Sequence, residues 1–290
     1  MTKEIAISLV RPKNYVHVDC FNPVISCLCL ALEMKGYKID VLFNVYTSDK
    51  PSIVIGAHLL DKPTELADLK KAVIYNFEQI SPESHWINKD YFKALLAKPY
   101  IDYSIANINS AFDINKGIVA RHLPFAYESP MDYTYVARDV FRVKTKDIDV
   151  LFFGSMNDRR AKVIDQLKNM GLHVQAVFGV YGPELSVLIH RSKVVLNMHY
   201  YESSIFEAVR VLPLLASRVA VVSEQSVDDS DYSYLNPPFG IKCVTYENLA
   251  STCKVLVEDN DARELLADTG YANVKLKAMV QSLENVGGLL

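Results

Sequence analysis

Three observations predict an α/β fold made of two Rossmann-like domains, each a doubly wound parallel sheet. The chain has 290 residues, which suits two domains of about 100–150 residues each. Nearly continuous apolar, β-branched runs alternate with helix-like runs, as expected for parallel strands joined by crossover helices. The alternation breaks at 126–147 and then restarts. Two such halves that face each other would enclose a cleft.

The first half contains six expected strands and at least one well-marked helix. The helix is expected from about Asn22 to Lys35, because Gly36 follows the last apolar residue of the pattern. The runs "TELADLKK" and "KDYFKALLA" are also helix-like. The expected strands are 4–10, 38–45, 52–58, 72–79, 100–108 and 117–125.

The second half repeats the pattern after a tyrosine-rich segment of mixed charge. We expect domains at 1–125 and 148–260, a linker at 126–147 and closing helices at 261–290. The helices of this half are expected at 159–170, 183–192 and after Ser204. Its expected strands are 148–155, 174–181, 193–199, 220–224 and 241–246.

Composition indicates an ordinary globular protein. Half of the residues are hydrophobic, 22% are charged and the net charge is −3, which does not favour nucleic acid as the general partner. The five cysteines form no C-x-x-C pair, as is usual for reduced thiols in an intracellular protein. The sequence shows no signal peptide, and its longest apolar run, "FNPVISCLCLALEM", falls short of the roughly 18 residues of a membrane span. We therefore expect a cytoplasmic protein without stable membrane insertion.

The turn "FGSMNDRR" in the second half is a candidate anion site. Gly154 and Ser155 let a ligand approach the backbone, and Arg159 and Arg160 stand at the start of a helix, where cations oppose the helix dipole. A bound phosphate would reverse that cost. The alternative is that Asp158 caps the helix and the two arginines point to solvent.

Two further stretches carry candidate residues. The turn "GVYGPE", with Tyr181, either is a simple tight turn or brings the backbone close to a nucleotide base. The stretch 197–224 contains His199, Glu207 and Arg210 and ends at Glu224. Ser204 and Glu207 fit an S-x-x-E capping box, which would need no ligand. The other polar groups favour a sugar-nucleotide site, where a carboxylate accepts the ribose hydroxyls.

Taken together, "FGSMNDRR", "GVYGPE" and "FEAVRVLPLLASRVAVVSE" resemble the donor half of GT-B glycosyltransferases, especially group-1-like bacterial and phage members. The resemblance implies that Glu207 matches the second glutamate of an E-x-x-x-x-x-x-x-E element and binds the donor ribose. His199 stands where the family has the first glutamate. Arg159 and Arg160 match the basic contacts to the diphosphate of a donor that we expect to be UDP-linked. The resemblance also implies that the closing helices cross back to the first domain.

The first half would then bind the acceptor. His17 and Asp19, in the loop after the first strand, are candidates for the general base that an inverting enzyme needs, whereas a retaining enzyme would use them only to orient the sugar. His58, Glu78 and Gln79 end strands and are candidate acceptor-binding residues, although each could be an ordinary loop residue. No metal-binding spacing is present, so we expect metal-independent transfer without a cofactor other than the nucleotide sugar.

The leading hypothesis is thus a glycosyltransferase that moves a hexosyl or pentosyl group to an acceptor hydroxyl. The default acceptor is a saccharide or lipid, with a hydroxymethylated base of phage DNA as a minority option. Two other classes stay open. One is a two-lobed binding protein for a sugar or other small ligand, and the other is a nucleotide-sugar epimerase.

Overall fold

The computed structural model describes residues 3–47, 49–81, 89–202, 204–227, 230–235, 239–286 and 288. The chain divides into two compact units. Unit 1 comprises Met1–Glu128 and Ala278–Leu290, and unit 2 comprises Ser129–Lys277. The division falls inside the segment 126–147 that the sequence indicated as the connection, and the chain returns to unit 1 only from Ala278 onward.

Within the described residues, unit 1 is built on a six-stranded parallel sheet of order β2-β1-β3-β4-β5-β6. The expected parallel α/β architecture is confirmed. The chain steps from β1 outward to β2 and then back past β1 to β3, so the switch point lies between β1 and β3. The strands are β1 (Lys3–Leu9), β2 (Tyr37–Phe43), β3 (Ser52–Ile55), β4 (Ala72–Asn76), β5 (Tyr100–Asp102) and β6 (Ala120–His122).

The helices of unit 1 include one that the sequence indicated as a strand. The run 100–108 was expected to be extended, but β5 ends at Asp102 and α3 (Ile105–Ile114) follows. Asp102 accepts a hydrogen bond from the Ser104 N–H at 3.0 Å, and Ser104 caps α3 by accepting from the Asn107 N–H. These local acceptors stop the strand and start the helix. α2 (Lys89–Ala97) matches its expected run, whereas "TELADLKK" forms a 3-10 helix at Pro63–Asp68.

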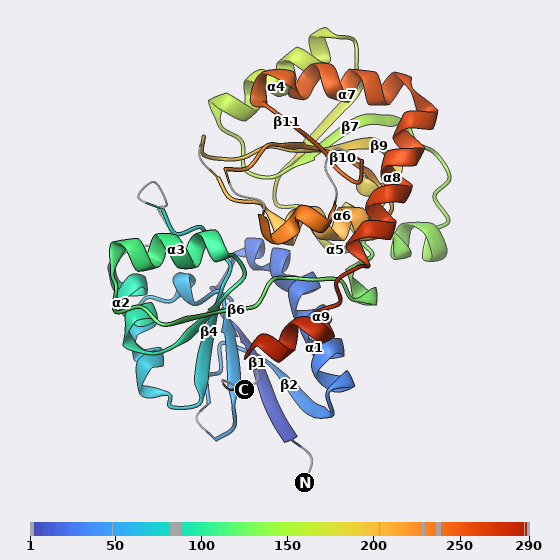
Figure 1. The fold of residues 1–290 in the computed structure, drawn as a ribbon. Coiled ribbons are helices and arrows are strands. Elements are labelled where there is room, and N and C mark those ends of the chain that lie inside the picture. Colours follow the sequence, from blue (N-terminus) through green and yellow to red (C-terminus); the bar gives the residue numbers. More distant parts are fainter. Residues whose placement is uncertain are drawn as a thin grey trace. The chain divides into compact units, whose positions relative to one another are not determined.

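The N-terminal helical run is longer than the sequence indicated. A 3-10 helix, Val16–Phe21, leads directly into α1 (Asn22–Met34), so Val16–Met34 is long and apolar enough by length and composition to cross a membrane. This corrects the expectation that no apolar run reaches that length. α1 packs against β2 and against α9 (Met279–Ser282), the short helix to which the chain returns (Figure 1). Its buried face is that of a core helix.

In the described part of unit 2, a five-stranded parallel sheet has the order β11-β10-β9-β7-β8. The chain steps from β7 to β8 and then crosses back to β9, which places the switch point between β7 and β9. In open parallel sheets ligands bind outside the carboxyl ends of the strands at such a point. The strands are β7 (Ile148–Phe153), β8 (Val174–Val177), β9 (Ser192–Asn197), β10 (Ala220–Glu224) and β11 (Lys242–Val244).

Helices cover both faces of the second sheet. α4 and α7 lie over one face, and α5 and α6 lie over the other (Figure 1). Phe152, Leu196 and Val222 of neighbouring strands meet Leu167 and Leu256 of α4 and α7 in one apolar core. The helices are α4 (Asp158–Asn169), α5 (Gly182–Arg191), α6 (Ala208–Ala216), α7 (Leu249–Glu258) and α8 (Asn260–Val274).

Candidate functional site

The carboxyl ends of β7 and β9 bring the predicted residues of unit 2 together. Gly154 follows β7 directly, while Asn197 ends β9 and His199 comes two residues later. α6 contributes Arg210, and Glu207 stands at its N-cap. We call Arg160, Asn197, His199, Glu207 and Arg210 the switch-point cluster.

Gly154 gives this cluster room. Its φ is +149°, a backbone conformation that side chains rarely adopt. A Cβ there would stand 3.3 Å from Arg210 Nη2 and 3.5 Å from Arg160 Nη1. Glycine therefore lets the end of β7 approach both guanidinium groups.

Arg160 is the buried cation of the cluster, with only 2% of its surface exposed. Asn157, not Asp158, caps α4 by accepting from the Arg160 N–H at 3.0 Å, so the alternative with a capping Asp158 and two solvated arginines is wrong. The Arg160 side chain donates to the main-chain oxygens of Ser155, Met198 and His199. Burial, together with the nearby Arg210, lowers its pKa to about 10, which still leaves it charged at neutral pH.

Glu207 is the only carboxylate of the cluster as defined. The capping-box interpretation is wrong, because α6 begins at Ala208 and Glu207 makes no side-chain cap. Its carboxylate lies 4.0 Å from Arg160 Nη2, 3.5 Å from Arg210 Nη1 and 3.8 Å from His199 Nδ1. Burial alone would raise its pKa, but Arg210, His199 and Arg160 together lower it to about 2.

The cluster carries an excess of positive charge. Arg160 and Arg210 contribute two positive charges and Glu207 contributes one negative charge. Arg210 donates to Asn197 Oδ1 at 3.2 Å and keeps 23% of its side chain exposed, as does Glu207 with 24%. A buried cation next to a partly exposed carboxylate and guanidinium suits an anion that also carries hydroxyl groups.

His199 lies deeper, with 1% of its surface exposed. Its Nδ1 has no hydrogen-bond partner among the described residues, and its Nε2 lies 3.5 Å from Ser226 Oγ. A buried polar atom without a partner costs free energy unless a ligand or water satisfies it.

Arg159 contacts the switch-point cluster only through the main-chain oxygen of His199, to which its Nη1 donates at 3.3 Å. Its guanidinium forms a two-pronged ion pair with Glu224 and packs 4.0 Å from the centre of the Tyr246 ring. The Tyr246 hydroxyl donates to the Arg159 main-chain oxygen at 2.7 Å. Glu224 also accepts from the His199 N–H at 3.0 Å, so both of its oxygens are engaged.

Ser155 and Tyr181 are not members of the switch-point cluster. The Ser155 carbonyl accepts from Arg160 Nη1 at 2.8 Å. Tyr181 is the N-cap of α5, with Gly179 and Gly182 on either side at positive φ. The turn therefore has the backbone freedom expected from "GVYGPE". The role of Tyr181 in donor binding stays a prediction.

In unit 1 the structure joins two of the predicted acceptor residues. His58 Nε2 lies 3.3 Å from Glu78 Oε1. Burial lowers the pKa of His58, although the Glu78 carboxylate partly offsets this. The Glu78 carbonyl accepts from the Asn76 and Asn107 amides, both at 2.8 Å, so buried amides fix the backbone that carries the carboxylate.

The other predicted residues of unit 1 lie apart from this pair. Asp19 forms an ion pair with Arg11 at 2.9 Å, and the His17 ring packs edge-on against Tyr15, with centroids 5.1 Å apart. Burial, and to a smaller extent the charge of Glu78, raises the pKa of Tyr15. Gln79 is half-buried. The roles of these residues stay predictions.

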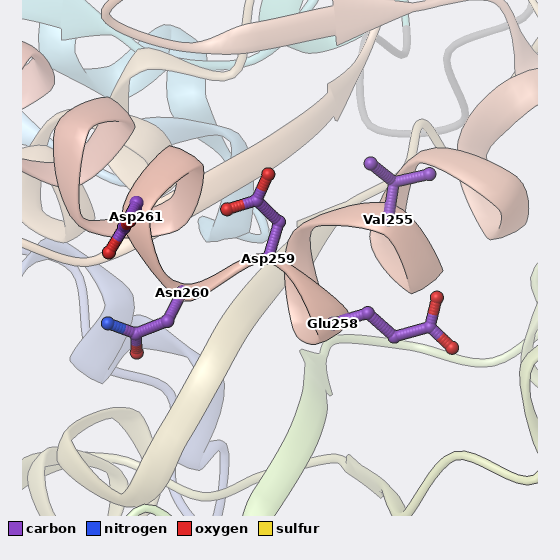
Figure 2. Close-up of a pocket in the computed structure, with 5 residues that line it drawn as sticks. All are labelled: Val255, Glu258, Asp259, Asn260 and Asp261. Atoms are coloured by element: carbon purple, nitrogen blue, oxygen red, sulfur yellow. The ribbon is translucent and has the colours of Figure 1, made fainter.

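An acidic depression at the turn between α7 and α8 is a different feature. Figure 2 shows its lining residues, Val255, Glu258, Asp259, Asn260 and Asp261. Asp259 caps α8 by accepting from the Ala262 N–H at 2.9 Å, and Glu258 pairs with Lys254. These contacts explain the carboxylates as helix-end residues. Across the described part of the chain, no three His, Cys, Asp or Glu side chains gather as metal ligands.

The sequence did not predict Asn197 of the switch-point cluster or Tyr246, which packs against Arg159. Asn197 ends an apolar strand, where its polarity was the available signal. Tyr246 lies in a short 3-10 helix (Tyr246–Asn248) after β11 and had no local signal, because its partner Arg159 is distant in sequence.

No family model matches the chain. Its sequence is 30% identical to protein L140 of Acanthamoeba polyphaga mimivirus over 220 residues, which are 74% of this chain and 68% of L140. The chain belongs to the L140 family. Proteins L138 and L137 of the same virus are 33% and 30% identical over 45% and 44% of this chain. The matches span only 14% and 17% of those two proteins.

Solved structures show that this L140-family chain has the GT-B fold, as the resemblance implied. HepE of Anabaena, in complex with UDP and glucose, is similar over 97% of the chain and 98% of its own, with 11% identity and a TM-score of 0.64. Sucrose-phosphate synthase of Thermosynechococcus elongatus is similar over 98% of both chains, with 14% identity and a TM-score of 0.61. A DNA-modifying β-glucosyltransferase is similar over 99% of both chains, with 14% identity and a TM-score of 0.62.

Proposed function

We propose that the chain is a glycosyltransferase that moves a sugar from a nucleoside-diphosphate donor, UDP-linked, to an acceptor hydroxyl. The observation that carries the proposal is the switch-point cluster at the carboxyl ends of β7 and β9. Its two positive charges, on Arg160 and Arg210, exceed the single negative charge on Glu207. The excess positive charge suits a diphosphate. The structural neighbours that were solved with UDP or UDP-glucose support the choice of donor.

Each residue has a distinct role in this proposal. Arg210 is partly exposed and donates directly to the diphosphate. The Arg160 side chain donates its hydrogen bonds to main-chain carbonyl groups, so it acts on the diphosphate through its positive charge alone. Glu207 stays ionised because its pKa is about 2, and it accepts the ribose hydroxyls. The N-terminus of α6 adds its positive dipole end.

Catalysis would rest on the leaving group. As the bond between the anomeric carbon and the diphosphate oxygen breaks, negative charge grows on the diphosphate. Fixed cations in a partly buried site stabilise that charge without reorganisation. In unit 1, His17 and Asp19 remain the predicted sources of a general base, and His58, Glu78 and Gln79 the predicted acceptor contacts.

The acceptor is proposed to be a saccharide or lipid hydroxyl. A hydroxymethylated DNA base is the second candidate, because one structural neighbour is a DNA-modifying β-glucosyltransferase. The net charge of −3 favours the saccharide or lipid.

The test is release of free nucleotide from sugar nucleotides. UDP-, GDP- and ADP-linked sugars are incubated with the protein, with and without magnesium or EDTA, alone and with saccharide, lipid or hydroxymethylated DNA acceptors. We expect UDP release that needs no metal and disappears in Glu207→Ala. No nucleotide release from any donor, together with tight binding of a free sugar, would instead support a binding protein. A changed sugar still attached to its nucleotide would indicate an epimerase.

A further inference from the structure

We infer that Arg159 and Glu224 are positioning residues that hold the backbone of His199, and that Arg159 is not a ligand of the diphosphate. This inference rests on the proposed function, because the site being positioned is the nucleotide site. It concerns four elements that are distant in sequence: α4, the end of β9, the end of β10 and the 3-10 helix Tyr246–Asn248.

The main chain of His199 is held from both sides. Its N–H donates to Glu224 Oε2 at 3.0 Å, and its carbonyl accepts from Arg159 Nη1 and Arg160 Nε, each at 3.3 Å. Glu224 is 5% exposed, so it has little access to a ligand in solution. Arg159 directs both Nη atoms at this carboxylate.

Tyr246 fixes the other side of Arg159. The guanidinium lies 4.0 Å from the ring centroid, and the Tyr246 hydroxyl donates to the Arg159 carbonyl at 2.7 Å. The hydrogen-bonded ion pair with Glu224 raises the pKa of Arg159, so the positive charge of Arg159 is stabilised at Glu224. For Arg159 to bind a diphosphate it would have to leave a buried carboxylate unpaired, which is costly.

What this arrangement sets is the position of the His199 ring and of Arg160. The ring stands 3.8 Å from Glu207 Oε2, and the Met198 and His199 carbonyls orient the Arg160 guanidinium. A shift of the His199 backbone would therefore move the buried cation and the partner of Glu207 together.

The experiment compares Arg159→Gln, Glu224→Gln and the double variant by calorimetric titration with UDP and with uridine. If both residues position His199, each single change weakens UDP binding about tenfold, uridine binding changes little, and the double variant is no worse than the singles. If Arg159 were a direct ligand, Glu224→Gln would release it and UDP would bind as tightly as before or more tightly. That opposite sign would overturn the inference.

A control variant and a pair of crystal structures distinguish a positioning role from a general loss of stability. Asp147→Asn breaks the exposed Arg191–Asp147 ion pair at the amino end of β7 and should leave UDP affinity unchanged. Crystal structures of the wild type and Glu224→Gln, without nucleotide, should show the His199 ring displaced from Glu207 in the variant. An unmoved ring would overturn the inference. Failure of the wild type to bind any nucleotide would refute the proposed function instead, and the crystal structures would then still decide this one.

Discussion

Arg160 Nη2 lies 4.0 Å from Glu207 Oε1, and this single carboxylate also faces Arg210 at 3.5 Å. The carboxyl edge of the second sheet thus holds two cations around one anion, and the cation of Arg160 is buried. A protein that keeps such an arrangement carries a cost that a bound anion relieves. The nucleotide-binding proposal and the predictions below depend on this imbalance.

Replacing Arg210 by Met should weaken UDP binding by about 10- to 100-fold, because a charge-assisted hydrogen bond to the diphosphate is lost. Binding of uridine, which has no phosphate, should change much less. Isothermal titration with the two ligands measures both effects. Lys168→Met removes an equal charge from an exposed position of α4 and serves as the control. An equal loss of UDP and uridine affinity in Arg210→Met would argue against a diphosphate contact.

His199→Glu would introduce the residue that the GT-B motif carries at this position. Here it should weaken UDP binding by about tenfold or more, because a second carboxylate at the position of the His199 ring, beside Glu207, cancels the excess positive charge, an effect worth at least about 1.4 kcal/mol. Gln166→Glu, an exposed change on α4, adds the same charge far from the cluster and should bind UDP normally. Unaltered affinity in His199→Glu would mean that the charge count does not control binding.

Gly154→Ala should lower stability by about 1–3 kcal/mol and also weaken UDP binding. The strain follows from φ +149°, and the binding effect follows from the Cβ that would press on Arg210 Nη2 at 3.3 Å. Gly171→Ala separates the two, since Gly171 has φ +82° but no atom within 4 Å of its added Cβ. Urea unfolding and UDP titration of both variants give the comparison. A Gly154→Ala protein that binds UDP as the wild type does would exclude the close approach.

Asp102 in unit 1 should make stability fall as the pH rises. Burial raises its pKa to about 7, only partly offset by hydrogen bonds from Asn76, Ser104 and Asn107. Because the folded pKa lies above the unfolded value of about 4, the stabilisation is complete below pH ~4 and is lost as the pH rises through about 7. Asp102→Asn should flatten this slope, by up to a few kcal/mol between pH 4 and 8.

Urea unfolding at several pH values checks this expectation. Asp113→Asn is the control, because Asp113 lies in the neighbouring α3 with 79% of its side chain exposed and pairs only with Lys116 among the contacts described. It should leave the pH slope unchanged. A slope that is identical in the wild type and Asp102→Asn would show that the buried carboxyl does not titrate in this range.

The sequence predicted the sheets better than it predicted the contacts. Parallel strands buried on both faces reveal themselves by continuous apolar runs, as "IDVLFF" and "AVVSE" do. The run 100–108 was wrongly predicted to be one strand for the same reason. Its apolar residues continue past the helix N-cap at Ser104, so the pattern does not show where the strand ends. Gly154 and His199 could be identified because a glycine and a histidine directly after apolar strands are visible in the sequence, and Glu207 because an acidic residue before an apolar helix is visible too.

The separate places of Arg159 and Arg160 could not be predicted. Adjacent side chains on a helix point about 100° apart, so Arg160 can point into the cluster while Arg159 points toward Glu224. Which of them does so depends on Glu224 and Tyr246, both more than 60 residues away in the chain. Likewise, Ser204 and Glu207 fit a capping box in the sequence, but that box needs a helix that starts at residue 205, and α6 starts at Ala208.

The affinity of the wild-type protein for uridine, UMP and UDP, measured by isothermal titration with EDTA present, decides whether the switch-point cluster binds a diphosphate. We expect that affinity rises with each phosphate and that UDP binds at least about tenfold more tightly than uridine, a difference of about 1.4 kcal/mol or more. We also expect Glu207→Ala to weaken the binding of all three ligands, because the ribose is common to them. Equal affinity for uridine and UDP, or no binding of either, would contradict a diphosphate site at the switch-point cluster.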